Sequence, residues 1–556
     1  MGGSSIMNPP THAPRRLLTV GLTGALLGLG LTAPVQSHAF CGFYVSGAEA
    51  KLYNDATMVV MMRDGQRTVL AMQNHYQGPP QDFALVIPVP TVLHEGDVQT
   101  LPRGVFDRVD KLAAPRLVEY WEQDPCAVAD PDPADGRGVP AGVAGGVPDP
   151  VAGVKVEAQF NVDEYQIVIL SAEDSTALDT WLRANEYNIP SMAEQLLRPY
   201  VAAGSKFFVA KVDPSKIAKP ADGSQRIELS PLRFHYDAEQ FSLPLRLGLI
   251  NANGPQDLLV HILAPNQRYR AANYPNVTIP TNLVVLDQTR ERFPEFYVSL
   301  FDHTLGRAPT AVVTEYAWSA GSCDPCPEPP LDLDELITLG AALLPSYANA
   351  LAPATTAEAK LAQRRLPRDF VLTRLHARYD ASSLGEDLVF EAAPALVGGR
   401  GMPDRAGALP PDVEQVGDHN SFQARYAILH PWASGVSCAQ PQRGLWGGPH
   451  DNGPSAPTLA RELAFVPRDA KLSEYVSTSA HAALGLAGPP TPILAPTAAS
   501  DPAPMTSPAA KQPAANRPGC SCDTNSNSGP LASLLALAGL LGFRRKHPTC
   551  RSSRTT

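Results

Sequence analysis

The chain has 556 residues, and its 45 Lys and Arg side chains against 55 Asp and Glu give a net charge of −10. This acidic balance argues against a nucleic-acid-binding protein, which normally carries a basic face. Hydrophobic residues make up 44% of the chain and charged residues 18%, which argues against a disordered chain, and 56 prolines with 42 glycines predict many turns and loops.

Residues 1–39 have the three-part pattern of a secretory signal peptide. Arg15 and Arg16 supply the positive start, residues 17–31 are apolar, and small residues occupy the positions that signal peptidase reads. We therefore expect signal peptidase to cleave between Ala39 and Phe40 during export. The apolar run is short for a membrane span, which needs about 20 residues, and this disfavours an uncleaved anchor.

Residues 40–487 are predicted to form one folded ectodomain of the α+β class, with mixed, largely antiparallel sheets, interspersed helices and long Pro/Gly-rich loops. Asp64-Gly65 lies between two β-rich runs and predicts a hairpin. Helical spacing predicts a helix over 105–121, kinked or split at Pro115. Further strands are predicted at 83–88, 165–170, 206–212, 226–229, 232–236, 243–249, 258–263, 311–318 and 370–379, and further helices at 174–184, 191–203 and 355–365. The segment 124–153 is expected to be an exposed loop excursion.

The ectodomain has five cysteines, and export would place them in an oxidising compartment where disulfides form. The sequence leaves open the pairing of Cys41, Cys126, Cys323, Cys326 and Cys438. The C-x-x-C motif makes Cys323 and Cys326 the candidate disulfide. Prolines at 327, 329 and 330 obstruct a helix at the motif, which favours a structural disulfide over a redox centre. A zinc site is disfavoured because no second ligand pair is present.

The sequence contains no motif for hydrolysis, phosphate binding or metal binding, so we expect no cofactor, no metal and no motif-based catalytic residue. The thirteen histidines are scattered singly, and each is expected to be an ordinary core or surface residue. The acidic residues 130, 132 and 135 are interpreted as a solvated loop, because the Gly and Glu of a calcium loop are missing. Asp332, Asp334 and Glu335 are expected at the start of a helix, where acidic residues complement the dipole.

The C-terminal part has a different composition. Residues 488–519 are rich in Pro, Ala, Ser and Thr and are predicted to be an extended spacer. Two cysteines, a short apolar run and a basic cluster follow as Cys520, Cys522, residues 531–543, Arg544, Arg545 and Lys546. A thirteen-residue helix rises about 20 Å, so it spans the membrane only with its polar flanks drawn in. We expect a short transmembrane helix with its basic cluster on the cytoplasmic side.

Residues 519–546 resemble the MYXO-CTERM sorting tail of myxobacterial surface proteins. The resemblance implies that a sorting protease processes the chain near Cys520 or Cys522 and that the protein is displayed on the cell surface. The usual Gly-rich spacer after the cysteine is replaced by residues 523–527, and which cysteine is used stays open. A simple tail anchor is the alternative.

The ectodomain resembles an uncharacterised, secreted bacterial family, domain of unknown function 2330. The stretches that carry the resemblance are 41–47, 73–90, 112–126, 323–336 and 372–379. The resemblance covers most of residues 40 to about 450 and implies no activity, so it assigns no catalytic residue.

These observations predict an exported protein of the cell envelope that is anchored at the outer surface or released after C-terminal processing. Its ectodomain is interpreted as a non-catalytic binding, adhesive or scaffolding module. The alternative is an exported enzyme, either a thiol redox enzyme at Cys323 and Cys326 or a hydrolase without a linear motif. The expected partners are the membrane, signal peptidase and a sorting protease, while the ligand and the oligomeric state stay open.

Overall fold

The computed structural model of the chain describes most of the predicted ectodomain. The described residues are 43–45, 53–77, 84–126, 155–185, 187, 189, 193–217, 229–251, 254–351, 355–409, 415–450 and 456–486. All of them belong to one compact unit. They form helices and mostly antiparallel or mixed sheets, which confirms the predicted α+β class.

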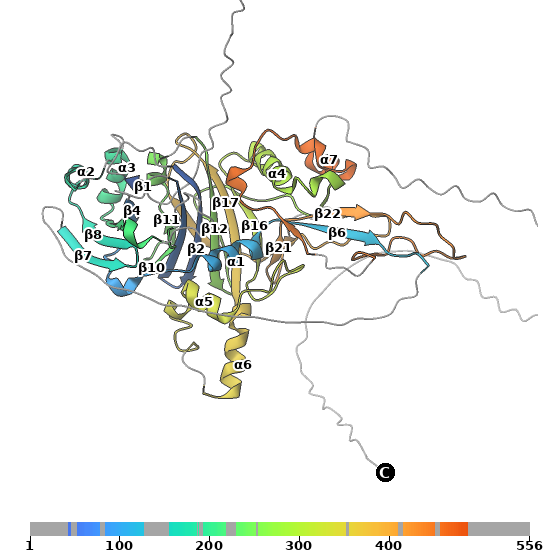
Figure 1. Cartoon of the computed structure of the whole chain (residues 1–556), viewed down its shortest axis with the longest axis horizontal. Helices are drawn as coiled ribbons and strands as arrows, with labels where there is room; N and C mark the ends of the chain where they lie inside the picture. The colour runs from blue at the N-terminus through green and yellow to red at the C-terminus, as the bar shows by residue number, and fades with distance from the viewer. Residues whose placement is uncertain are drawn as a thin grey trace, which may run out of the picture. The chain divides into compact units, whose positions relative to one another are not determined.

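The centre of the fold is an 11-stranded sheet (Figure 1). Ten strands follow one another across it: β20 (Gln415–Val416), β19 (Leu396–Gly398), β21 (Ser421–Gln423), β16 (Val312–Ser319), β17 (Phe370–Tyr379), β12 (Gln256–Pro265), β2 (Tyr53–Asp64), β3 (Arg67–Gln77), β10 (Leu232–Asp237) and β5 (Val98–Thr100). β14 (Asn276–Thr278) pairs with β16 in parallel. The long strands β12 and β17 are antiparallel over their whole length, and β12 runs parallel to β2. These long strands make the rigid support for the buried site described below.

β2 and β3 form the predicted hairpin. Asp64 pairs with Arg67, and Gly65 turns the chain with a φ of 57°, a conformation that glycine adopts without a Cβ clash. Both strands are apolar at consecutive positions, because their alternate residues join buried clusters on opposite faces of the sheet. The central sheet is therefore covered on both faces.

One face of the central sheet packs against a second, five-stranded antiparallel sheet, with which it shares a hydrophobic cluster. Its strands are, in order, β1 (Phe43–Val45), β4 (Ala84–Val89), β9 (Lys206–Val212), β8 (Tyr165–Ser171) and β7 (Lys155–Val162). Two helices cover its outer side, α2 (Ser175–Ala184) and α3 (Ala193–Ala202). The predicted cap of α2 is present, because the side chain of Asp174 accepts a hydrogen bond from the backbone N–H of Ala177 at 2.8 Å.

Helices cover the opposite face of the central sheet (Figure 1). These helices are α1 (Arg103–Ala113), α5 (Leu333–Leu339), α4 (Phe293–Arg307) and α7 (Thr478–Leu484). α1 and α5 pack in one hydrophobic cluster, and α4 and α7 pack in another. The sheet residues between these two apolar clusters include the buried charges of the candidate site.

Two smaller sheets complete the described structure. One has the strands β11 (Ser242–Leu243), β18 (Leu388–Ala393) and β13 (Arg268–Ala271), and the other has β15 (Leu283–Val284), β22 (Arg425–His430), β6 (Arg116–Glu122), β23 (Trp446–Gly447) and β24 (Thr458–Leu459). β6 and β22 run parallel. The predicted helix at 355–365 is α6 (Ala357–Arg365), and short 3-10 helices lie at Glu95–Asp97, Pro214–Lys216, Arg246–Asn251, Asp287–Thr289, Ala341–Leu343, Leu366–Asp369, Leu463–Phe465 and Leu472–Glu474.

Two sequence predictions about local structure were wrong. The predicted helix at 105–121 ends at Ala113, and residues 116–122 form strand β6 instead. Proline at 115 lacks the backbone N–H that a continuing helix needs, and β22 offers a strand partner that is distant in sequence. The predicted strand at 243–249 was also wrong. Only Leu243 at its start lies in a strand, and most of the range lies in the 3-10 helix Arg246–Asn251.

Several predictions fall on residues outside the described part of the chain. They concern the signal peptide and its cleavage site at Ala39 and Phe40, Cys41, most of the 124–153 excursion, the 488–519 spacer and the tail with Cys520, Cys522, Arg544, Arg545 and Lys546. Within the described residues, no helix combines the length and the apolar character that crossing a membrane requires.

A disulfide between Cys126 and Cys438 joins residues 312 positions apart in sequence. Cys126 follows β6, and Cys438 lies in the segment between β22 and β23. The bond therefore links the two ends of a very long loop of chain. A cross-link of this kind restricts the unfolded chain strongly, and more so than a cross-link between near neighbours.

Replacing Cys126 and Cys438 together by Ser is expected to lower the free energy of unfolding by about 2–5 kcal/mol, because the unfolded chain regains the entropy that the long loop removes. Urea unfolding followed by tryptophan fluorescence measures this change. The matched control is Cys323→Ser/Cys326→Ser, which opens a bond between residues only three apart in sequence and should have a smaller effect. Equal losses in the two double variants would contradict the loop-entropy explanation.

Candidate functional site

The C-x-x-C motif forms a disulfide loop between β16 and α5. Cys323 and Cys326 are bonded to each other, with Cα atoms 4.9 Å apart, so the structure contains the candidate disulfide. Cys326 is exposed, whereas Cys323 is half-buried and packs against the hydrophobic cluster under α1 and α5. One sulfur thus faces solvent and the other faces the protein.

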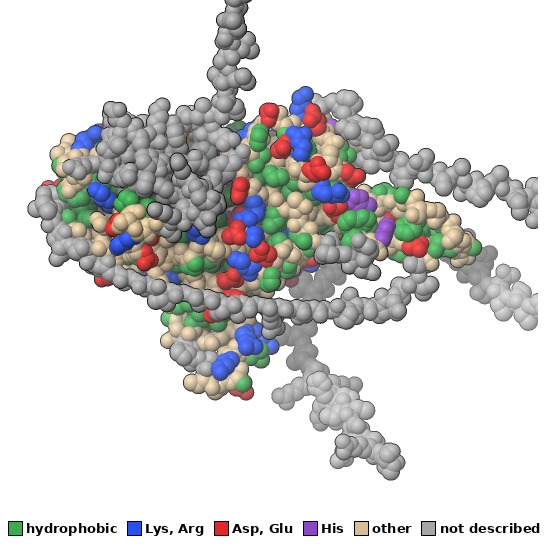
Figure 2. All heavy atoms as spheres, in the orientation of Figure 1, with side chains coloured by type: hydrophobic (Ala, Val, Ile, Leu, Met, Phe, Trp, Pro, Cys, Tyr) green, Lys and Arg blue, Asp and Glu red, His purple; other side chains and the backbone are tan. Residues whose placement is uncertain are grey.

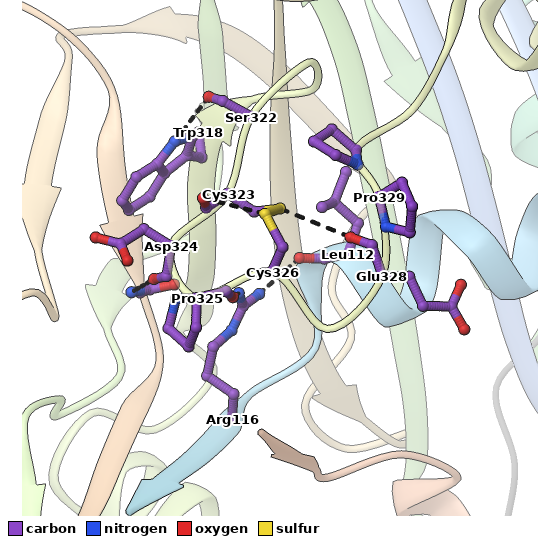
Figure 3. The surroundings of a disulfide bond; sticks show 12 residues. Leu112, Arg116, Trp318, Ser322, Cys323, Asp324, Pro325, Cys326, Glu328 and Pro329 are labelled. Carbon is purple, nitrogen blue, oxygen red and sulfur yellow. Dashed lines mark hydrogen bonds between the residues drawn. A yellow bond between two sulfur atoms is a disulfide. The ribbon is translucent and has the colours of Figure 1, made fainter. Parts of the chain in front are cut away.

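Side chains from other parts of the fold hold this loop, and Figure 3 shows one of them, Trp318, next to Ser322. Gln423 of β21 donates a hydrogen bond to the carbonyl oxygen of Asp324. The carboxylate of Asp324 pairs with Arg400 at 2.8 Å. Trp318 of β16 donates from its indole N–H to the hydroxyl of Ser322 at 3.1 Å. The disulfide is therefore one of several restraints on this loop.

Arg116, the first residue of β6, contacts the same loop from inside the protein. Its side chain is fully buried, and its Nη1 donates to the carbonyl oxygen of Pro325 at 2.7 Å. Its Nη2 donates to the carbonyl oxygen of Leu112 at 2.6 Å, and its guanidinium lies 5.5 Å from the ring centroid of Tyr316. Burial lowers the pKa of Arg116, and the described residues supply no ion-pair partner for it.

The helix after the motif starts too late to act on the cysteines. α5 begins at Leu333, and Asp332 caps it by accepting a hydrogen bond from the backbone N–H of Glu335 at 2.9 Å. Glu335 returns the interaction to the backbone of Asp332, which completes a capping box. The acidic residues thus mark a helix start, as predicted. The positive end of the helix dipole lies at this cap, six residues after Cys326, so it does not act on the motif.

A second cluster of functional groups is buried in the centre of the large sheet. Arg374 and His376 are on the same face of β17, and Glu315 of β16 lies between them at a β-bulge. Arg374 Nε donates to Glu315 Oε2 at 2.6 Å, and His376 Nδ1 lies 2.7 Å from Glu315 Oε1. Tyr297 of α4 donates its hydroxyl hydrogen to the same carboxylate at 2.6 Å. Bulges often re-aim a side chain in this way.

The cluster continues in two directions from this centre. Arg374 also pairs with Asp110 of α1 at 2.6 Å, and Asp110 accepts a further hydrogen bond from Arg461. At the other end, His376 Nε2 lies 3.0 Å from Asp257 of β12. We call the set Asp110, Asp257, Tyr297, Glu315, Arg374, His376, Arg461 and Arg468 the buried ionic cluster; its last member, Arg468, donates to both carboxylate oxygens of Asp257 at 2.9 Å.

The buried ionic cluster reaches the surface along α1. Arg461 pairs with Asp107 as well as Asp110, and Lys111 pairs with Asp107 at 2.9 Å. Figure 2 shows acidic and basic side chains interleaved on the face of the molecule that carries α1. The outer pairs are solvent-screened and contribute little, whereas the inner pairs are enclosed.

Burial and charge act in opposite directions on the pKa values of the cluster. Burial raises the pKa of Glu315, but the charges of His376 and Arg374 outweigh it and lower that pKa to about 2. Burial lowers the pKa of His376, yet the neighbouring Glu315 and Asp257 carboxylates more than offset this and raise it. His261, which pairs with Arg374 across β12 and β17, has its pKa lowered to about 3 by burial and by the Arg374 charge.

An imidazole between two carboxylates can in principle move a proton, but here no substrate can reach it. The side chains of Glu315 and Arg374 are 0% exposed and that of His376 is 1% exposed, and the ring of Phe301 stacks on His376 at 3.9 Å. Within the described residues, no group of three or more His, Cys, Asp and Glu side chains could hold a metal ion. We interpret the buried ionic cluster as a device that fastens α1, α4 and residues 461–468 to the sheet.

Sequence reasoning found the disulfide loop but missed the buried ionic cluster. Its signal was present in β17, where Arg374, His376 and Arg378 occur at every second position of an otherwise apolar strand. Such spacing places all three on one face of a strand. The scattered histidines were expected to be ordinary core or surface residues, and His376 is a buried one with two acidic partners.

A family model described as an uncharacterised protein conserved in bacteria, domain of unknown function 2330, matches residues 35–391. This match contains the Cys323–Cys326 loop, Arg116 and most of the buried ionic cluster, but not Arg461 and Arg468. No curated protein and no solved structure matches the chain.

Arg374→Met is expected to lower the free energy of unfolding by about 3–5 kcal/mol, because it leaves Glu315 and Asp110 buried without their shared cation. Chemical denaturation measures the loss. Arg270→Met is the matched control, because Arg270 pairs with Glu391 where both side chains are about half exposed, and it should change stability by less than about 1 kcal/mol. A similar small change in both variants would show that the buried pairs are not needed for the fold.

The free energy of unfolding is expected to fall as the pH drops from about 6.5 towards 2. The pKa of His261 is lower in the folded chain than its ordinary value, so below about pH 6.5 the unfolded state binds the extra proton. The lowered pKa of Glu315 adds stability that is complete above its ordinary value of 4.5 and is lost as the pH falls through about 2. His376 acts in the opposite sense, because its pKa is raised in the folded chain. It adds stability that is complete when the pH is below the ordinary pKa of 6.5, and this stability is lost as the pH rises through the raised pKa.

Denaturation midpoints measured between pH 4.5 and 8 test this dependence. His261→Met should flatten the decline between pH 6.5 and 4.5, whereas His419→Gln, at an exposed histidine, should leave it unchanged. An unaltered acid limb in His261→Met would contradict the assignment.

Proposed function

The chain belongs to this family of uncharacterised bacterial proteins. We propose that it is an exported, surface-anchored protein whose ectodomain binds or scaffolds. The family match supplies no activity, so the proposal depends on the chemistry of the chain itself. Its parts are export, anchoring and a non-catalytic role.

Export is supported by the state of the cysteines. All four cysteines among the described residues, Cys126, Cys323, Cys326 and Cys438, are paired in two disulfides. Disulfides persist in secreted and periplasmic proteins and are rare in the reducing cytosol. Two disulfides in one folded unit are the observation that carries the proposal, and they agree with the signal-peptide pattern of residues 1–39.

Anchoring is supported by the order of segments after the ectodomain. A Pro-rich spacer over 488–519 precedes Cys520, Cys522, an apolar run and the basic residues 544–546. In the proposed arrangement signal peptidase removes the first segment, a sorting protease acts near the two tail cysteines, and the spacer holds the ectodomain away from the membrane. The outer surface is the proposed location.

A binding or scaffolding role is supported by how the acid–base groups are used. The imidazole and carboxylates that would suit a hydrolase, His376, Glu315 and Asp257, are enclosed and bonded to one another. Hydrolysis needs these groups to contact a substrate and a water molecule. These three residues are thus engaged in holding the fold, which favours the non-catalytic role over a hydrolase that would use them.

Replacing Cys520 and Cys522 together by Ala is expected to abolish C-terminal processing and to reduce surface display strongly, since the sorting protease would lose its recognition residue. Labelling of intact cells with a membrane-impermeant amine reagent, together with the mass of the mature chain, measures both. Ser521→Ala is the matched control and should leave both unchanged. Unaltered display and processing in the double cysteine variant would overturn the sorting role of the tail.

A further inference from the structure

A buried cation without an acidic partner lies against the Cys323–Cys326 loop. The Arg116 guanidinium donates hydrogen bonds to backbone carbonyl oxygens, including that of Pro325, the residue immediately before Cys326. The Asp324 carboxylate attracts it, but no carboxylate of the described residues forms an ion pair with it. Figure 3 shows it beneath the loop, between the end of α1 and the two cysteines. A buried charge that no opposite charge compensates destabilises the state that contains it. A state of the loop that supplied an anion would therefore be favoured.

The candidates for this anion are Asp324 and the two cysteines. Asp324 is exposed and already paired with Arg400. A cysteine can supply a negative charge only after the disulfide is reduced, as a thiolate. A neighbouring cation lowers the pKa of a thiol and stabilises its thiolate. In the oxidised loop Asp324 attracts Arg116 but forms its ion pair with Arg400, whereas the reduced loop can provide a thiolate as a further anion.

We propose that the Cys323–Cys326 disulfide is a thiol–disulfide exchange site for dithiols of other polypeptides, and that Arg116 stabilises the thiolate of its reduced form. Arg116 is a positioning and charge-stabilising residue in this proposal and does not react. The proposal goes beyond surface anchoring and does not depend on it. The sequence disfavoured redox chemistry at the motif, because the prolines after it obstruct a helix there. The proposal assigns this chemistry to the motif on the basis of Arg116 instead.

The exchange proceeds in two balanced steps. A thiolate of the partner polypeptide attacks the exposed Sγ of Cys326, the bond to Cys323 breaks, and its electron pair leaves on Cys323 Sγ as a thiolate. The second thiolate of the partner then attacks its own sulfur in the mixed disulfide, and the electron pair leaves on Cys326 Sγ. The partner dithiol loses two electrons and two protons and becomes a disulfide, while the loop gains two electrons and becomes a dithiol once its two thiolates take up two protons through solvent.

The geometry of the loop suits such a reaction. Cys326 is accessible to an incoming sulfur, and Cys323 is shielded by the apolar cluster under α1. The contacts of Asp324 with Gln423 and Arg400, and of Pro325 with Arg116, do not involve either sulfur. They remain available when the bond is reduced, so the two thiols stay close enough to re-form it. Arg116 takes the part that a helix N-terminus plays in other C-x-x-C sites.

The first experiment is a redox titration of the full chain with mixtures of reduced and oxidised glutathione, followed by acid quenching, alkylation and peptide mass spectrometry. The expected result is that Cys323–Cys326 is reduced at glutathione ratios that leave Cys126–Cys438 oxidised. In a titration at about pH 9.5, where the thiol is ionised in both chains, Arg116→Gln should require about tenfold more reducing conditions, the equivalent of one pKa unit of lost thiolate stabilisation. Arg116→Lys should lie closer to the native chain. Arg270→Gln is the matched control, because Arg270 is about half exposed, pairs with Glu391 and makes no contact with the loop, and it should change the ratio little.

The second experiment measures the pKa of the Cys326 thiol in Cys323→Ser from the pH dependence of its alkylation by iodoacetamide, read on the peptide that contains it. The expected pKa lies at least about one unit below the ordinary 8.5 of a free cysteine. A pKa of 8.5 or above, or a Cys323–Cys326 bond that resists glutathione as strongly as Cys126–Cys438, would overturn the proposal and leave the disulfide purely structural. Both readouts use chains that retain Arg116, so they decide the question even where Arg116→Gln does not fold.

Discussion

The fold depends on the requirement that charges taken out of water must meet opposite charges. Glu315 lies inside the protein with Arg374 and His376 as its partners, and neither of these can be exchanged for solvent. The partners in turn hold Asp110 on α1 and Asp257 on β12. Helix α1, the strands β12, β16 and β17, and residues 461–468 therefore have to pack together in the folded state, because a buried charge on any one of them would otherwise be uncompensated. Hydrophobic packing fills the space on either side, and the ionic pairs determine which elements pack there.

This requirement also extends the folded unit past the region that defines the family. The family match ends at residue 391, yet Arg461 and Arg468 contribute to neutralising Asp110 and Asp257 inside it. Strand β22 and Cys438 likewise come from beyond residue 391 and join β6 and Cys126 within it. The residues after the match are part of the same structure, and they complete its buried contacts.

Local sequence signals predicted those parts of the fold that nearby residues determine. The hairpin at Gly65, the cap at Asp174 and the strand β17 all arise from patterns within about ten residues. The predictions failed where a distant partner decided the structure. β6 became a strand because β22, some 300 residues later, pairs with it, and a helical pattern within 105–121 contains no information about that partner.

The same distinction between nearby and distant partners explains which parts of the candidate site could be predicted. A spacing of three residues was enough to suggest that Cys323 pairs with Cys326, whereas Arg116 meets that loop across 209 positions of sequence and could not be placed there. The same holds for His376, because the alternation of Arg374, His376 and Arg378 in β17 signals buried polar groups but does not identify Glu315 as a partner. Charge partners are set by topology, and topology was the part that the sequence left open.

The link from Cys126 to Cys438 has a consequence for the order of events during biogenesis. A chain that crosses a membrane N-terminus first delivers β6 and Cys126 early, while β22 and Cys438 follow only after most of the ectodomain has emerged. Until then β6 lacks its strand partners β22, β23 and β24, and Cys126 lacks Cys438, so the early part of the chain can form neither this small sheet nor this disulfide. In the proposed export, this sheet and this disulfide can therefore form only after the segment that contains β22 and Cys438 has crossed the membrane.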